Sequence, residues 1–219
     1  MGLALAVPSA QAAPKADLCS SGRRQSPIDI VAAVPTALPA LSLQYRPAPL
    51  RIVNDGHTVR VRLANGSRLL QGNQSHTLQQ FHFHMPGGDR IRGQEFPLAI
   101  HFLHKSAAGQ LVALVVLFRQ GDENTALAAL LPHMPERGQP ERVLAGVMVD
   151  PAQLVPPATG YYAYEGSETA PPCTEGVRWL VMKQALSVSA AQLAALARLF
   201  PSHVRPVQPL NGRVVQQSQ

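Results

Sequence analysis

Short runs of alternating apolar and polar side chains, separated by proline and glycine, dominate this chain. The alternation is clearest over residues 41–45 and 57–63. Successive side chains of a strand point to opposite faces, so both runs predict strands with one buried and one polar face. In the second run, this period places His57 on the same inward face as Val59 and Val61.

Four further runs are apolar almost throughout and lack internal glycine or proline, which indicates buried strands. They cover residues 78–85, 98–104, 111–118 and 177–183. Helical patterns are sparse. Asn124 is placed to cap a short helix that ends at Leu131, and Ser189 is placed to cap a second helix over 190–199. Many strands with two short peripheral helices predict a mainly β protein with one large, mostly antiparallel sheet.

Length and composition fit a single domain. The chain has 219 residues, of which 46% are hydrophobic and 15% charged, enough apolar material for a sizeable core. No run approaches the eighteen or so apolar residues that a membrane-spanning helix requires. The net charge of +6 comes from scattered arginines without interleaved aromatic residues. A nucleic-acid surface would need a clustered basic stripe, so we expect no nucleic-acid partner.

The N-terminal segment and the two cysteines indicate export. Residues 1–12 are small and apolar and end in a small-x-small pattern typical of signal-peptide cleavage, although the usual basic start is missing. Cys19 and Cys173 then make sense as one disulfide in an oxidising compartment, so we expect a periplasmic or secreted protein. The alternative is two unrelated buried thiols.

Candidate chemistry lies in two of the apolar strands. In the run from Gln80 to His84, His82 and His84 fall on one face, while the intervening phenylalanines fall on the other. A third imidazole, His101, follows on the next strand. Three neutral nitrogen ligands with a fourth position left open are typical of a catalytic zinc site. A His-x-His pair alone would more simply be two hydrogen-bonded core histidines.

Six strings in fixed order give the chain a specific resemblance to the α-class carbonic anhydrases, in particular to exported bacterial members with one disulfide. The likeness covers about residues 18–215, which we take as one domain. The strings occupy residues 25–30, 54–57, 80–84, 96–104, 166–177 and 205–211.

This resemblance implies a twisted central sheet of about ten strands around a conical cleft. It implies that Zn²⁺ is held by His82, His84 and His101, and that the reaction is the reversible hydration of CO₂ to bicarbonate. Gln80 matches the residue that fixes the ring tautomer of His82.

The remaining site residues also follow from the resemblance. His57 matches the proton shuttle at the mouth of the cleft, because an imidazole titrates near neutral pH. Thr169 matches the hydroxyl that orients the zinc-bound nucleophile. The residues that match the lining of the apolar CO₂ pocket are Leu103, Ala113, Val177 and Trp179.

Several positions depart from the family pattern. Ala99 replaces a glutamate that would accept the ring N–H of His101, and losing such a partner typically costs 10–100-fold in metal affinity or activity. Gly88 replaces a glutamate that would accept the hydroxyl proton of Thr169, with Asp89 as a potential shorter substitute. Glu168 replaces an apolar residue beside the CO₂ pocket. The aromatic segment that usually precedes the first cysteine is also absent.

These departures predict a zinc carbonic anhydrase that is slower than a typical family member. The main alternative is a zinc-binding domain that has lost catalysis; retention of His57 and Thr169 argues against it. A cupin-like metal enzyme would also carry His-x-His on a strand, but it leaves the other five strings unexplained.

Overall fold

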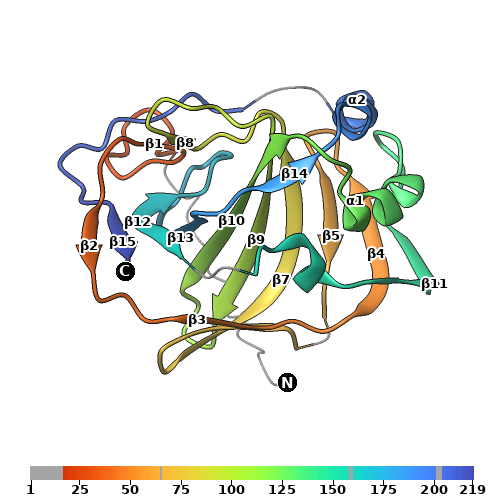
Figure 1. Ribbon diagram of the computed structural model, residues 1–219, viewed down its shortest axis with the longest axis horizontal. Coiled ribbons are helices and arrows are strands. Elements are labelled where there is room, and N and C mark those ends of the chain that lie inside the picture. The colour runs from red at the N-terminus through yellow and green to blue at the C-terminus, as the bar shows by residue number, and fades with distance from the viewer. Residues whose placement is uncertain (1–16, 65, 158–159, 201–203) are drawn as a thin grey trace, which may run out of the picture.

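The computed structural model describes residues 17–64, 66–157, 160–200 and 204–219, and it is mainly β (Figure 1). Strands form at every predicted run. They are β3 (Leu41–Gln44), β5 (Val59–Arg62), β7 (Gln74–His84), β9 (Leu98–Ser106), β10 (Leu111–Gln120) and β13 (Glu175–Met182). The other strands are β1 (Asp29–Ile30), β2 (Val34–Thr36), β4 (Ala48–Asn54), β6 (Arg68–Gln71), β8 (Arg90–Ile91), β11 (Arg142–Val149), β12 (Tyr161–Ser167), β14 (Leu186–Val188) and β15 (Gln216–Ser218).

One large sheet organises the described part of the chain. Ten of its strands follow the order β11-β4-β5-β7-β9-β10-β13-β12-β15-β2, while β3, β6 and β14 pair beside this path. Most pairs are antiparallel, with parallel pairs where β10 meets β13 and β14 and where β15 meets β2. The prediction of a large, mostly antiparallel sheet is therefore confirmed. A separate parallel pair, β1 and β8, lies beside it.

The two faces of the sheet carry separate apolar clusters, because side chains alternate along each strand. On β9, Leu98, Ile100 and Phe102 belong to the larger cluster. Ala99 belongs to the smaller one, together with Ala113 and Trp179 of the neighbouring strands. This alternation is what places His101 on the side of the smaller cluster.

The helices pack against the larger cluster. α1 (Thr125–Leu130) begins where the side chain of Asn124 accepts a hydrogen bond from the Leu127 N–H. α2 (Ala190–Leu199) begins with a capping box between Ser189 and Gln192. Both predicted caps are thus present. Two short 3₁₀ helices also occur: η1 (Leu131–His133) directly after α1, and η2 (Pro151–Leu154) after β11.

A disulfide joins Cys19 to Cys173, with 5.0 Å between their Cα atoms. It fastens the N-terminal end of the described chain to the loop between β12 and β13, where the Leu18 N–H also donates to the Pro172 carbonyl at 2.9 Å. The signal-like segment over residues 1–12 lies outside the described residues. None of the helices in the described part of the chain has the length and apolar character needed to cross a membrane.

Candidate functional site

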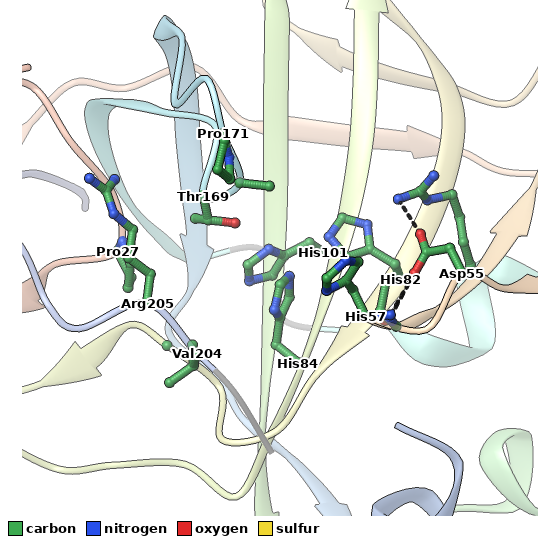
Figure 2. Close-up of a pocket in the computed structure, with 14 residues that line it drawn as sticks. Pro27, Asp55, His57, His82, His84, His101, Thr169, Pro171, Val204 and Arg205 are labelled. Carbon is green, nitrogen blue, oxygen red and sulfur yellow. Dashed lines mark hydrogen bonds and ion pairs between the residues drawn. The ribbon is translucent and has the colours of Figure 1, made fainter. Parts of the chain in front are cut away.

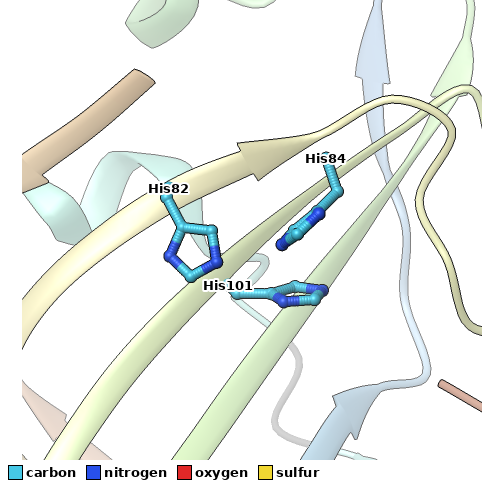
Figure 3. Close-up of side chains that lie close together, drawn as sticks. All are labelled: His82, His84 and His101. Atoms are coloured by element: carbon cyan, nitrogen blue, oxygen red, sulfur yellow. The ribbon is translucent and has the colours of Figure 1, made fainter. Parts of the chain in front are cut away.

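Three imidazoles from two adjacent strands converge on one point. His82 and His84 are two residues apart on β7, and His101 of β9 lies directly opposite His82 in the antiparallel register. One ring nitrogen of each histidine is turned toward the other two rings (Figure 3), and the three potential ligand atoms lie within 4.8 Å of one another. Spacing along β7 brings only His82 and His84 together. The register between β7 and β9 adds His101 and so completes the cluster.

The chemistry of this cluster fits a metal cation. Burial lowers the pKa of both His82 and His101 well below the ordinary value, and the neighbouring histidines lower it further, so these rings are neutral near pH 7. Nδ1 of His82 lies 3.0 Å from Oε1 of Gln80. An amide oxygen only accepts, so this nitrogen carries the ring proton and the other has a lone pair for a metal. Three imidazoles with room for a fourth ligand suit zinc.

The imidazole cluster opens into a cavity of about 350 Å³. Its walls differ in character (Figure 2). Asp55 lies on one side of the three histidines and Thr169, Pro171 and Val204 lie on the other, while His57 is drawn beside His82. The complete lining consists of Pro27, Asp55, His57, Thr58, Arg60, His82, His84, Gly88, His101, Thr169, Ala170, Pro171, Val204 and Arg205.

His57 reaches this cavity from the turn between β4 and β5. Strand β5 begins only at Val59, and His57 is exposed, whereas Val59 and Val61 are fully buried. The prediction that His57 shares their inward face is therefore wrong. The turn contains Gly56 at φ +88°, which interrupts the strand period and lets His57 line the cavity.

Thr169 lies in the loop after β12 and lines the cavity. Its neighbour Glu168 is exposed, is not part of the cavity lining, and donates its backbone N–H to the Thr174 carbonyl at 2.9 Å. The substitution at Glu168 therefore places its carboxylate in solvent.

The four residues predicted to line a CO₂ pocket lie together, but behind the cavity. Leu103, Ala113 and Trp179 are direct neighbours across β9, β10 and β13, and Val177 precedes Trp179 by two residues on the same face. They belong to the smaller apolar cluster, and none of them lines the cavity. The indole of Trp179 meets the His101 ring edge-on at a centroid distance of 5.1 Å. This arrangement gives the imidazole cluster an apolar back wall.

The departure at Ala99 removes a hydrogen-bond acceptor for the His101 ring. Ala99 is fully buried, opposite His84 in the register and on the same face of β9 as His101. Its methyl group offers no hydrogen-bond acceptor, and among the described residues the buried Nε2 of His101 has no hydrogen-bond partner.

At Gly88, the backbone conformation itself favours glycine over the glutamate of the family pattern. Gly88 has φ +85°, and an added Cβ would lie 3.2 Å from a methyl carbon of Val204 and 3.5 Å from Pro27. Asp89 does not fill the gap. It is 1% exposed, and its Oδ1 accepts hydrogen bonds from the Ile28 N–H at 3.0 Å and the Tyr164 hydroxyl at 2.8 Å. Asp89 therefore holds Tyr164 and the backbone just before β1.

Sequence reasoning missed the polar contacts beside His57. Asp55 forms an ion pair of 2.9 Å with Arg60, which lies opposite His82 on the neighbouring strand, and both residues line the cavity. The period of β5 could have identified Arg60, because it falls on the face opposite to Val59 and Val61. No sequence signal identifies its partner, because the turn geometry brings Asp55 back toward the strand.

Comparison with known proteins gives consistent matches. A sequence model of the eukaryotic-type carbonic anhydrases matches residues 10–219. A carbonic anhydrase of Pectobacterium carotovorum is 39% identical over 204 residues, covering 92% of this chain and 83% of the relative. The α-carbonic anhydrase of Photobacterium profundum superimposes with a TM-score of 0.86 at 36% identity, covering 92% of both chains. The enzyme from Thermovibrio ammonificans, in complex with the inhibitor sulfanilamide, gives 0.85 at 38% identity, covering 92% and 89%.

Proposed function

Because the chain belongs to the eukaryotic-type, or α-class, carbonic anhydrase family, we propose that it hydrates CO₂ to bicarbonate at a zinc ion held by His82, His84 and His101. The convergence of three imidazoles in the lining of one cavity carries this proposal. A zinc ion there would supply Lewis-acid chemistry that lowers the pKa of water to about 7, for which carbonic anhydrase is itself the standard example.

The residues around the cluster have separate tasks. Gln80 fixes the tautomer of His82, and with it the nitrogen that faces the metal. The Thr169 hydroxyl lies on the cavity wall opposite Asp55 and orients the attacking oxygen by hydrogen bonding. Leu103, Ala113, Val177 and Trp179 keep the back of the site apolar, which favours CO₂ over bulk water.

His57 completes the cycle. Hydration releases a proton that must reach the solvent, and an exposed imidazole at the cavity wall can accept it and pass it on. We further propose that the protein works in an oxidising compartment, the periplasm or the exterior. The disulfide supports this, because such bonds are rare in reducing compartments.

A zinc-binding protein without catalysis is the second candidate. It is favoured by the Nε2 of His101, which has no hydrogen-bond partner in the described part of the chain, and by Gly88. At both places the family has a carboxylate that supports catalysis. Both features also fit a slower enzyme. Rate measurements separate the two candidates.

Stopped-flow CO₂ hydration on the zinc-loaded protein tests the proposal, with His101→Ala as the blank. We expect a rate above the blank that sulfanilamide, the ligand of the Thermovibrio relative, abolishes. His57→Ala should lower kcat, leave kcat/KM unchanged, and recover when imidazole buffer is added. Fully zinc-loaded protein with no rate above the blank between about pH 6 and 9 would leave the second candidate.

A further inference from the structure

The pairing of β5 with β7 stops at the cavity. The last register pair is Arg60 with His82, and Thr58 lies beyond it in the turn that carries His57. At this point a side chain replaces the backbone ladder. The Thr58 hydroxyl accepts a hydrogen bond from the Phe83 N–H at 3.1 Å and lies 2.6 Å from the Phe83 carbonyl, to which it donates.

Phe83 is the residue between His82 and His84, so this clamp acts on the backbone that carries both imidazoles. Thr58 and Phe83 are almost completely buried, at 6% and 1% exposure. A buried N–H or carbonyl group that loses its partner keeps the full cost of having left water. Removing the Thr58 hydroxyl would therefore leave both Phe83 groups without this partner, at that cost.

The backbone of Thr58 is linked to that of His57 through the side chain of Asp55. Oδ1 of Asp55 accepts hydrogen bonds from the backbone N–H groups of His57 and Thr58, at 3.0 and 2.9 Å. Its Oδ2 forms the ion pair with Arg60. The turn is thus fixed within itself by Asp55 and fixed to β7 by the hydroxyl of Thr58.

We infer that Thr58 is a positioning residue that holds the His57 turn and the His82–His84 segment in one arrangement. This inference rests on the proposed function, in which those segments carry the proton relay and two zinc ligands. It assigns Thr58 an effect on the metal site without contact with the metal. Removing the hydroxyl should loosen both segments, and restoring any hydroxyl should hold them again.

Thr58→Val removes the hydroxyl at nearly constant volume, Thr58→Ser retains it, and Thr58→Ala removes it with less bulk if the valine variant does not fold. Ser67→Ala is a matched control. Ser67 is fully buried and clamps the backbone of Arg46 in the same way, with Oγ 3.0 Å from the Arg46 nitrogen and 3.5 Å from its carbonyl oxygen, but it does not line the cavity.

The first measurement is the rate at which zinc leaves each folded protein for an excess of chelator. We expect zinc to dissociate about tenfold faster from Thr58→Val, the lower end of the range for supporting residues. Thr58→Ser and Ser67→Ala should stay near the wild-type rate. Wild-type dissociation from a folded variant without the hydroxyl would overturn the inference, since a merely structural threonine lowers stability without changing that rate.

The second measurement is amide hydrogen exchange in the metal-free proteins. Loss of the hydroxyl should speed exchange at Phe83 at least tenfold relative to Phe81, which pairs with Val61 in the regular ladder. Unchanged exchange at Phe83 would overturn the inference. If the wild-type protein binds no zinc, the proposed function fails instead, and this exchange ratio alone decides whether Thr58 holds the strand.

Discussion

The buried carboxyl group of Asp89 should make the stability of this protein depend on pH in a defined way. Burial raises its pKa from 3.8 to about 6, although the hydrogen bonds from Ile28 and Tyr164 act in the opposite direction to burial. In Asp89→Asn, the amide oxygen can still accept these bonds, but the side chain no longer titrates. The variant therefore isolates the cost of ionising one buried group.

The magnitude follows from the two pKa values. The folded value lies above the unfolded one, so the protonated group's contribution to stability is complete below about pH 3.8 and disappears as the pH rises through about 6. A shift of about two units corresponds to about 3 kcal/mol. Of this, about 2 kcal/mol is lost between about pH 4.5 and pH 7.5.

Urea unfolding of the wild type and Asp89→Asn over this pH range tests the reasoning, with the disulfide kept intact. Other titrating groups are common to both proteins and cancel in the difference. We expect the free energy of unfolding of the variant, relative to the wild type, to increase by about 2 kcal/mol from about pH 4.5 to pH 7.5. A difference that does not change with pH would refute the assignment of a raised pKa to Asp89.

Three further predictions concern the metal site and the disulfide. Gln80→Ala should weaken zinc binding 10–100-fold in a chelator competition, while Gln79→Ala, whose exposed side chain donates a hydrogen bond to the Thr77 carbonyl, should not. Ala99→Glu should slow zinc dissociation by giving the His101 ring a hydrogen-bond acceptor, whereas Ala99→Leu, which adds bulk alone, should not. Equal dissociation rates in the two variants would exclude a hydrogen bond to His101 as the cause. Replacing both Cys19 and Cys173 by serine should lower the free energy of unfolding by at most about 5 kcal/mol in denaturant titration, and an unchanged midpoint would contradict a stabilising bridge.

Much of the sheet could be predicted because its central strands are apolar on both faces. Within β9 and β10, residues 98–104 and 111–118 contain no glycine or proline and are apolar apart from His101 and His104. β4 and β12 gave no such signal. Pro49 interrupts β4, where it faces Met148 at an irregular point of the β11 pairing, and Gly166 lies near the end of β12, where an added Cβ would collide with Ser26.

The histidine cluster shows where prediction from sequence stops. Alternation placed His82 and His84 on one face, but the position of His101 opposite His82 depends on an irregularity between Leu78 and Gln80 that shifts the β7 register. The position of His57 could not be obtained from alternation, because the turn at Gly56 breaks the period. Contacts across a turn or between strands depend on tertiary geometry that a local pattern does not contain.

We propose that CO₂ hydration takes place at the three-histidine zinc site. Zinc can be added stepwise to metal-free protein, with bound zinc and the CO₂ hydration rate measured in the same samples. We predict that the rate rises in proportion to bound zinc and levels off at one equivalent, and that His101→Ala gives no such rise. One equivalent of zinc bound to His82, His84 and His101 with no increase in rate would contradict the claim.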